Sequence, residues 1–507
     1  MANKKIFSPG VAFSAVTNHA GGLAFAKSDE QALAQFVMTG TFNDTFYVKG
    51  EDQLAQVLER SQKVRDEFLA KLAIYSREHG FMKDMPALLC ALLVVRGSEH
   101  ADAVFARVID NAKMLRNFVQ MLRGGVVGRK SLGSKGKRLV KGFIANLSDY
   151  ALWEASVGND PSLTDVLKLA HPKAKDDRRN ALYAYVMGKP CDAALLPDFI
   201  QDYESFAKGE IQKAPLKVPF QKLTALPLST KDWARIATNA RWQMTRMNLN
   251  TFSRHGVFED RKMVSMVAER LANRENVLSA RAFPYQLMAA MINAGSDVPL
   301  KIRTALEDAM EIALENVPEI FGRTVVAIDV SGSMGDPVTG HRAGSTSSVK
   351  CINVAALVGA ALRRKNRQAT ILTFDFNCRE VKVPANARIM TICEKIGRSG
   401  GGTDCGSVMR YINDQKIALD NLVLVSDNES WRDGYRSSLS ELWAGYKTRF
   451  PKARMINLDI TPNEYSATAE RKDTLRVGGF SDEVFRVMAQ FLEGSGTQVD
   501  AVNAVQL

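Results

Sequence analysis

The stretch TVVAIDVSGSMGD, residues Thr324 to Asp336, is an apolar run that ends in a carboxylate and continues with two hydroxyls at alternating positions. Further apolar runs of strand length, QATILTFD, NLVLVSD and RMINLDI, follow downstream with helical segments between them. Apolar strands that alternate with helices are typical of a parallel sheet covered on both faces. We therefore predict a doubly wound α/β (Rossmann-like) domain over residues 323–507.

Polar residues follow the predicted strands at the ends where such sheets bind ligands. Two carboxylates and three hydroxyls form an oxygen-only set, which suits Mg²⁺, or alternatively Mn²⁺. The residues are Asp329, Ser331 and Ser333 after the first strand, Thr403 in the glycine-rich stretch SGGGTDCGS, and Asp427 after NLVLVS. A lone DxSxS is equally typical of a helix cap. The prediction of a metal site therefore depends on all three segments together.

This constellation resembles the metal-ion-dependent adhesion site of von Willebrand factor A domains. The resemblance implies a site that holds a partner's acidic group at an open position of the ion. A metal-dependent nuclease or phosphatase is the enzymatic alternative, but no histidine follows these strands to act as a general base. We therefore expect that the chain is not an enzyme.

The chain from Ala32 to about Leu314 shows apolar residues at three- and four-residue steps, as in Asp52–Gly80. Helices of about a dozen residues, separated by Gly, Pro or polar turns, bury their faces by stacking as hairpins. We predict an all-α, HEAT-like helical-repeat domain over residues 1–322. The stretch GTFNDTFYVKG, Gly40 to Gly50, is rich in strand formers and predicts a short extended segment.

Composition narrows the class of protein. The chain has 507 residues, 46% of them hydrophobic, and lacks an apolar run of membrane-spanning length or a secretory signal. Six scattered cysteines without CxxC spacing argue against a disulfide framework. We expect a cytoplasmic protein that is not bound to a membrane.

The net charge of +12 is concentrated in one segment. Between Arg107 and Lys141 ten cations face a single acid, Asp110. Such an excess is typical of a surface that contacts a polyanion, although a solvated helix face is the ordinary alternative. The candidate RNA-binding residues are Arg116, Arg123, Arg129, Lys130, Lys135, Lys137, Arg138 and Lys141.

Four stretches of the chain carry a further resemblance: GRKSLGSKGKRLVKGFI (128–144), LTDVLKLAHPK (163–173), ARAFPYQLMAAM (280–291) and VGGFSDEVFRVM (477–488). With the order of the two domains, the first three resemble the TROVE module of the Ro60 ring proteins, and the fourth is similar to the closing segment of that family. The resemblance spans nearly the whole chain. It assigns His171 to RNA contact. The family has a lysine and an arginine before this histidine, whereas residues 152–160 of this chain carry no cation. The residues that could supply the missing positive charge instead are Lys173, Lys175, Arg178 and Arg179.

The family resemblance also implies a fold and partners. In the family the helical repeats close into a monomeric ring. Small Y-type RNAs bind its outer surface, and single-stranded 3′ ends of misfolded RNAs enter its basic hole. The implied role is RNA quality control or processing, with an exoribonuclease such as polynucleotide phosphorylase as a possible partner. The alternative is a protein-binding scaffold that captures an acidic partner through the metal site.

Overall fold

The computed structural model describes residues 15–17, 23–40, 42–44, 49–157, 161–280, 284–341, 348–384, 386–397, 399–427, 438–461, 465–469, 471–479, 483–494 and 496–507. The chain divides into two compact units. The sheet unit comprises Met1–Val64 and Leu314–Ala504, and the helical unit comprises Arg65–Ala313 and Val505–Leu507. The predicted domains, 1–322 and 323–507, are drawn differently from this division, in which the described residues up to Val64 group with the sheet.

The sheet unit is built on six strands in the order β5-β4-β3-β6-β7-β9. Every neighbouring pair is parallel except β4 and β5, which are antiparallel. The strands are β3 (Thr324–Asp329), β4 (Thr370–Phe374), β5 (Cys378–Glu380), β6 (Asn421–Ser426), β7 (Arg454–Asp459) and β9 (Thr474–Gly478). The chain leaves β3 to form β4 on one side and later forms β6 on the other, so the strand order reverses at β3.

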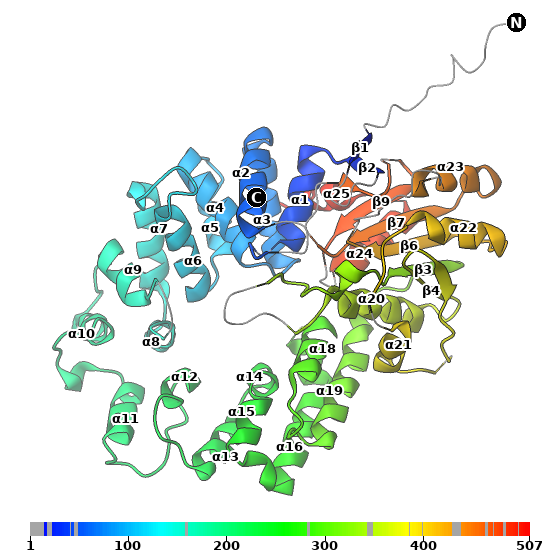
Figure 1. The fold of residues 1–507 in the computed structure, drawn as a ribbon. Helices are drawn as coiled ribbons and strands as arrows, with labels where there is room; N and C mark the ends of the chain where they lie inside the picture. Colours follow the sequence, from blue (N-terminus) through cyan, green and yellow to red (C-terminus); the bar gives the residue numbers. More distant parts are fainter. Residues whose placement is uncertain are drawn as a thin grey trace, which may run out of the picture. The chain divides into compact units, whose positions relative to one another are not determined.

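Helices cover both faces of this sheet, as predicted (Figure 1). On one face Val325 and Ala327 pack with α22 (Gly406–Asp414) and α23 (Leu439–Arg449) in a buried cluster that includes Trp443. On the other face α20 (Cys351–Lys365) and α21 (Ile389–Ile396) pack together, and α20 lies against β3. A Cβ at Gly359 would lie 2.4 Å from Cδ1 of Ile328, so α20 approaches the strand more closely than a side chain at this position permits.

The N-terminal segment completes the sheet unit. Strands β1 (Ala15–Thr17) and β2 (Leu23–Ala26) form a small antiparallel sheet with β8 (Tyr465–Ser466). Helix α1 (Asp29–Thr39) begins at a capping box formed by Ser28 and Gln31 and packs against β9. The same unit contains α2 (Gly50–Lys63), α24 (Glu483–Glu493) and α25 (Gln498–Asn503).

The helical unit consists of helices that pack mainly against near neighbours in the sequence (Figure 1). Its α-helices are α3 (Asp66–Glu78), α4 (Asp84–Arg96), α5 (Ala101–Val108), α6 (Ala112–Arg123), α7 (Gly133–Asn146), α8 (Asp149–Ala155), α9 (Leu163–Ala170), α10 (Asp177–Val186), α11 (Asp198–Ala207), α12 (Phe220–Leu223), α13 (Thr230–Asn239), α14 (Trp242–Met247), α15 (Leu249–Arg254), α16 (Arg261–Ala272), α17 (Arg274–Ser279), α18 (Pro284–Asn293) and α19 (Leu300–Ala313). This arrangement confirms the predicted all-α region. Among the residues described, no helix is long and apolar enough to cross a lipid bilayer.

Two local predictions differ from the structure in detail. The periodic stretch Asp52–Gly80 forms two helices, because the chain is extended at Val64 and Arg65 between α2 and α3. Of the segment predicted to be extended near 40–50, residues 41 and 45–48 lie outside the described residues. Within the remainder, Asp44 forms an isolated antiparallel bridge with His341.

Candidate functional site

The predicted metal ligands lie where the strand order reverses. Asp329 is the last residue of β3, and Asp427 directly follows the neighbouring strand β6. Ser331 and Ser333 follow Asp329, and their Oγ atoms are 3.3 Å apart. These four side chains are buried. The parallel pairing of β3 with β6 thus brings the two carboxylate-bearing segments to the same edge of the sheet.

Backbone hydrogen bonds hold the glycine-rich loop against this segment. The amide of Gly400 donates to the Val330 carbonyl at 2.8 Å, and the amide of Gly332 donates to the Gly401 carbonyl at 2.9 Å. A Cβ at position 332 would lie 3.3 Å from that carbonyl oxygen, which is why glycine suits this close approach. Thr403, which follows in the same loop, is buried. The structure therefore brings together the three segments that carry the predicted ligands.

The electrostatics of the site favour a cation. Burial and the neighbouring charge of Asp427 raise the pKa of Asp329 to about 7, against hydrogen bonds from Ser426 and Ser331 that lower it. A divalent cation between the two carboxylates would offset the free-energy cost of burying two like charges close together, and would therefore favour their ionised forms. Within the described residues no group of three or more His, Cys, Asp or Glu side chains is placed to hold a metal. A metal here would therefore depend on hydroxyl and water oxygens, as Mg²⁺ and Mn²⁺ do.

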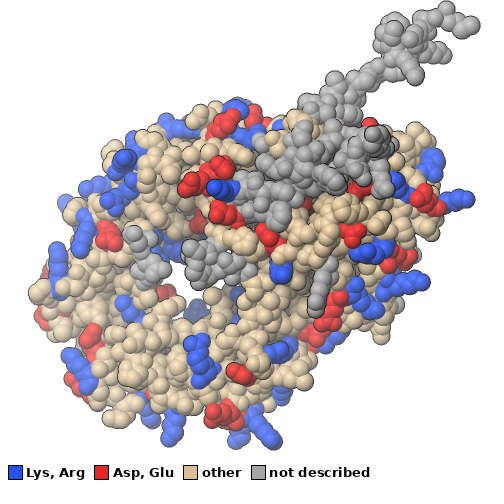
Figure 2. Space-filling view, viewed as in Figure 1, with Lys and Arg blue, Asp and Glu red and all other residues tan. Residues whose placement is uncertain are grey.

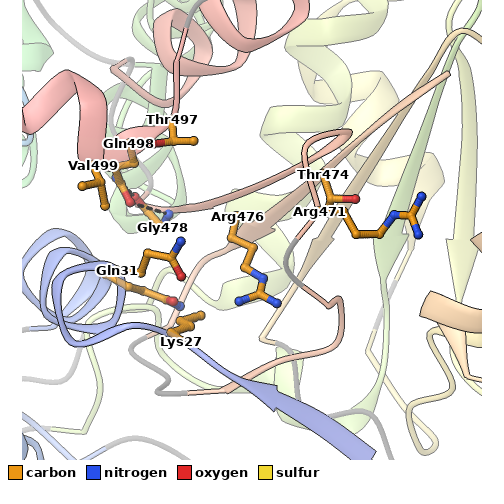
Figure 3. Close-up of a pocket in the computed structure, with 10 residues that line it drawn as sticks. Lys27, Gln31, Arg471, Thr474, Arg476, Gly478, Thr497, Gln498 and Val499 are labelled. Carbon is orange, nitrogen blue, oxygen red and sulfur yellow. Dashed lines mark hydrogen bonds between the residues drawn. The ribbon is translucent and has the colours of Figure 1, made fainter. Parts of the chain in front are cut away.

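The sheet unit also contains a buried ion pair that the sequence did not predict. Lys27 Nζ lies 2.7 Å from Asp459 Oδ2, and both side chains are inaccessible to solvent. Burial lowers the pKa of Lys27 and raises the pKa of Asp459, and the attraction between the two opposes both shifts. Figure 3 shows Lys27 and Arg476 at a small pocket of about 60 Å³ beside Gln498, which exchanges two hydrogen bonds with Gly478. The Lys27–Asp459 pair holds the N-terminal segment to β7, and the hydrogen bonds between Gln498 and Gly478 hold α25 (Gln498–Asn503) to β9.

In the helical unit, acids from other helices neutralise part of the predicted basic segment. Arg107 pairs with Glu78 at 2.7 Å, and Arg138 pairs with Asp102 at 2.7 Å. Lys135 lies 3.9 Å from the same carboxylate and donates to the Ser98 carbonyl at 2.8 Å. These acids belong to α3 and α5, outside the stretch that lacks acids in the sequence. For Lys135 and Arg138, contact with RNA stays a prediction.

Two of the predicted arginines lie against the protein itself. Arg116 donates from α6 to the carbonyls of Ala155 at 3.3 Å and Val157 at 3.1 Å. Burial lowers the pKa of its guanidinium. The Arg129 guanidinium lies against Gly133, the first residue of α7, where a Cβ would be 2.5 Å from Nη1. Both side chains therefore have local structural contacts in addition to their predicted role.

The remaining predicted cations lie on α6, α7 and the loop between them. In the part of the chain that the structure describes, no ion pair involves these residues, which are Arg123, Lys130, Lys137 and Lys141. Lys137 and Lys141 are four residues apart and share one face of α7. We call these four residues the basic surface. Figure 2 shows Lys and Arg side chains gathered over the part of the helical unit that holds α7 and α9.

Helix α9 connects this surface to His171. It packs against both α6 and α7. Hydrogen bonds from Ser162 lower the pKa of its Asp165 most, and the charges of Lys168 and then Arg123 lower that pKa further. His171 caps the helix in the left-handed conformation, at φ 51°, and is exposed. Its contact with RNA stays a prediction.

Of the four residues that could supply the missing positive charge, Arg179 is buried and the other three are exposed. Arg179 is 3% exposed and donates to Asp149 at 2.5 Å and to the carbonyls of Ile144, Ala145 and Leu147. It therefore closes the C-terminal end of α7 and is not available as a surface charge. Lys173, Lys175 and Arg178 are exposed.

Three comparisons with known proteins agree with this fold. The family model of the Ro60 vWA domain matches residues 323–492. The RNA-binding protein RO60 of Deinococcus radiodurans is 28% identical over 94% of this chain and 95% of its own length. The protein of the same name from Caenorhabditis elegans is 23% identical over 46% of this chain and 38% of its own length. Both of these proteins are named for RNA binding.

The fold of a solved relative covers the same range. The crystal structure of the Ro (Rsr) protein of Deinococcus radiodurans superposes with a TM-score of 0.63 and covers 92% of this chain and all of that chain, at 22% sequence identity. Sequence and fold thus match along nearly the whole length. The chain is therefore similar to the Ro60 proteins along nearly its whole length, and its residues 323–492 match the Ro60 vWA domain.

Proposed function

We propose that this chain is an RNA-binding protein of the Ro60 type, and that its basic surface contacts RNA phosphates. The observation that carries the proposal is the similarity along nearly the whole chain to a protein named for RNA binding. The placement of Lys137 and Lys141 on one face of α7 supports it physically. Lysine and arginine side chains bind phosphates by releasing counterions, which gives affinity without sequence selectivity and makes binding weaken with salt.

We propose the following finer assignments from the family resemblance. Y-type RNAs bind the outer surface of a ring, and single-stranded 3′ ends of misfolded RNAs enter a central hole. The protein acts in the cytoplasm as a monomer in RNA quality control, beside an exoribonuclease such as polynucleotide phosphorylase. Preference for single strands over duplex would follow from contacts with unpaired bases and a flexible backbone.

We propose that the sheet unit binds Mg²⁺, or alternatively Mn²⁺, through Asp329, Ser331, Ser333, Thr403 and Asp427. The ion would supply an open coordination position for an acidic group of a partner. Asp329 and Asp427 would provide the charge, and the hydroxyls would orient toward the ion. The burial of this oxygen set favours a second candidate function, a scaffold that captures an acidic protein at the metal.

A gel-shift or anisotropy experiment tests RNA binding. A structured RNA with a single-stranded 3′ tail is titrated with the wild-type chain and with Lys137→Gln/Lys141→Gln, each over a salt series. We expect the double variant to bind about tenfold more weakly at low salt and to show a shallower salt dependence. Arg364→Gln in the sheet unit is the control. Equal binding by the wild type and the double variant would contradict the proposed surface, and the absence of RNA binding by the wild type would contradict the function.

A further inference from the structure

A shallow hollow lies beside α11 and α13 in the helical unit, away from the residues of the basic surface. Its cavity volume is about 520 Å³, within the range of about 300–1,000 Å³ that is typical of small-ligand sites. The residues that matter here are the cations Lys213, Lys217 and Arg235, the apolar Ile211 and Leu216, and the single acid Asp202. We call this hollow the α11–α13 groove.

The loop that carries two of these cations is held in place on both sides. The amide of Ala214 donates to Asp232 Oδ1 on α13 at 3.1 Å, and Ala214 is buried. Val218, at the other end of the short segment, is buried as well. Lys213 precedes the first of these anchors and Lys217 precedes the second. The backbone therefore presents both lysines at the groove without a large loss of loop entropy on binding.

The groove carries an excess of positive charge. Three cations face one carboxylate, and in the described part of the chain no ion pair involves Lys213, Lys217 or Arg235. Arg235 is close enough to Asp232 to contribute to lowering the pKa of that acid, after burial, which raises it, and hydrogen bonds from Ser229 and Ala214. The Asp232 carboxylate itself accepts hydrogen bonds from the Ala214 and Ser229 amides. An anionic ligand can therefore approach the lysines without displacing an ion pair.

Apolar surface lies beside these cations. Ile211 is 37% exposed and Leu216 is 44% exposed, and both line the groove. A nucleotide in a single strand presents a charged phosphate together with an unpaired base whose face is apolar. A duplex presents phosphates but keeps its base faces stacked inside, and would leave both aliphatic side chains in water.

We propose that the α11–α13 groove binds an unpaired segment of single-stranded RNA, with phosphates at Lys213, Lys217 and Arg235 and a base or sugar against Ile211 and Leu216. The proposal rests on the proposed RNA-binding function and adds a second contact site to it. An acidic protein segment would use the same cations and is the competing occupant.

The test is fluorescence anisotropy of the full chain with a short labelled single-stranded RNA and with a blunt duplex of the same sequence, between about 50 and 200 mM salt. Lys213→Gln/Lys217→Gln removes the charges, and Leu216→Ser removes the apolar contact. Lys208→Gln, an exposed lysine that does not line the groove, is the matched control. Circular dichroism of each variant verifies the fold.

For single-stranded RNA we expect the lysine double variant to bind about tenfold more weakly at low salt and to lose about 1.4 from its log–log salt slope, since each phosphate contact contributes about 0.7. Leu216→Ser should bind several-fold more weakly with an unchanged slope, because the lost contact carries no charge. Leu216→Ser should leave duplex binding unchanged, and Lys208→Gln should behave as wild type in every assay.

The outcomes separate this inference from the proposed function. If the groove variants bind single-stranded RNA as wild type does while Lys137→Gln/Lys141→Gln binds weakly, the groove proposal is overturned and the proposed function stands. If the wild type binds no RNA, both are overturned. If the lysine double variant loses only the binding of a labelled poly-glutamate peptide and retains RNA binding, the groove is a protein site and the proposal is overturned.

Discussion

The hydroxyl of Ser426 donates a 2.6 Å hydrogen bond to Oδ2 of Asp329, across two neighbouring strands and 97 positions of sequence. The other carboxylate oxygen, Oδ1, accepts the amide of Ser331 at 2.8 Å. Both oxygens of the principal predicted ligand are therefore oriented by hydrogen bonds. Partners of this kind fix the direction of a ligand and influence the affinity of a metal site.

The first prediction concerns Ser426. Ser426→Ala should weaken Mn²⁺ or Mg²⁺ binding by about 10- to 100-fold, because Asp329 loses the hydrogen bond that orients it. Ser426→Thr retains the hydroxyl and should recover most of the affinity. Isothermal titration calorimetry with the full chain measures both. Equal affinity in the wild type and Ser426→Ala would show that this hydrogen bond does not organise the site.

The second prediction concerns the effect of the metal on stability. A divalent ion at about 100 times its dissociation constant should stabilise the wild type by about 2.7 kcal/mol. Asp329→Asn should abolish this gain, although without metal it should be no less stable than the wild type, because it relieves the repulsion with Asp427. Thermal denaturation with Mg²⁺ or with EDTA measures both effects. Asp414→Asn, at an exposed position, is the control, and a retained metal-dependent gain in Asp329→Asn would contradict the assignment.

The third prediction compares two adjacent arginines. Arg179→Ala should destabilise the helical unit by about 3 kcal/mol, because it leaves Asp149 and the carbonyls at the end of α7 without their buried donor. Arg178→Ala, at an exposed position, should change stability by no more than about 0.5 kcal/mol. Urea unfolding followed by circular dichroism measures the difference. Similar values for the two variants would contradict the buried role of Arg179.

The fourth prediction concerns acid stability. Burial alone would raise the pKa of Asp473, but hydrogen bonds from Arg471 and Trp443 and the charge of Lys447 hold that pKa at about 2. Because the folded-state pKa lies below the unfolded value of about 3.9, this carboxylate stabilises the fold above about pH 4, and the contribution disappears as the pH falls toward 2. The contribution is about 1 kcal/mol after allowance for partial solvent exposure.

Asp473→Asn tests this contribution. The variant should be less stable than the wild type at neutral pH, and the difference should shrink as the pH falls from about 4 to about 2. Denaturant unfolding monitored by fluorescence at several pH values measures it. A difference between the two proteins that stays constant over this range would show that Asp473 does not titrate as described.

The strands, and the placement of the predicted metal ligands at one edge of the sheet, were predictable because their signals are local. The run Thr324–Asp329 has the composition of a buried parallel strand, and the order of strands places Asp329 and Asp427 at one edge. Ser426 was not predictable as the partner of Asp329, since any hydroxyl at a strand end gives the same pattern. Thr403 was predictable as part of its loop, but the hydrogen bonds that hold this loop depend on backbone atoms.

The number of cations in a sequence segment does not show how many of them remain unpaired in the folded protein. Glu78 and Asp102 lie outside the acid-free segment, yet they pair with Arg107 and Arg138 in the folded structure. The same limit applies to Lys27, whose partner Asp459 is 432 positions away. Strands β1, β2 and β8 are two to four residues long, which is too short for a periodic signal. Long-range pairing decides these features, and local composition does not reveal it.

The packing of α1 and β2 with the C-terminal strands has a consequence for synthesis on the ribosome. The N-terminal segment is synthesised first, whereas β7, β8 and β9 are synthesised near the end. Lys27 can therefore form its ion pair with Asp459 only late in synthesis. The intervening helices, which are rich in local contacts, can fold in the meantime. Helix α2 can pack against α1 early, but the surface of α1 that contacts β9 and α25 stays uncovered until the last strands emerge. A nascent chain with this apolar surface uncovered is prone to aggregate until the last strands have been made.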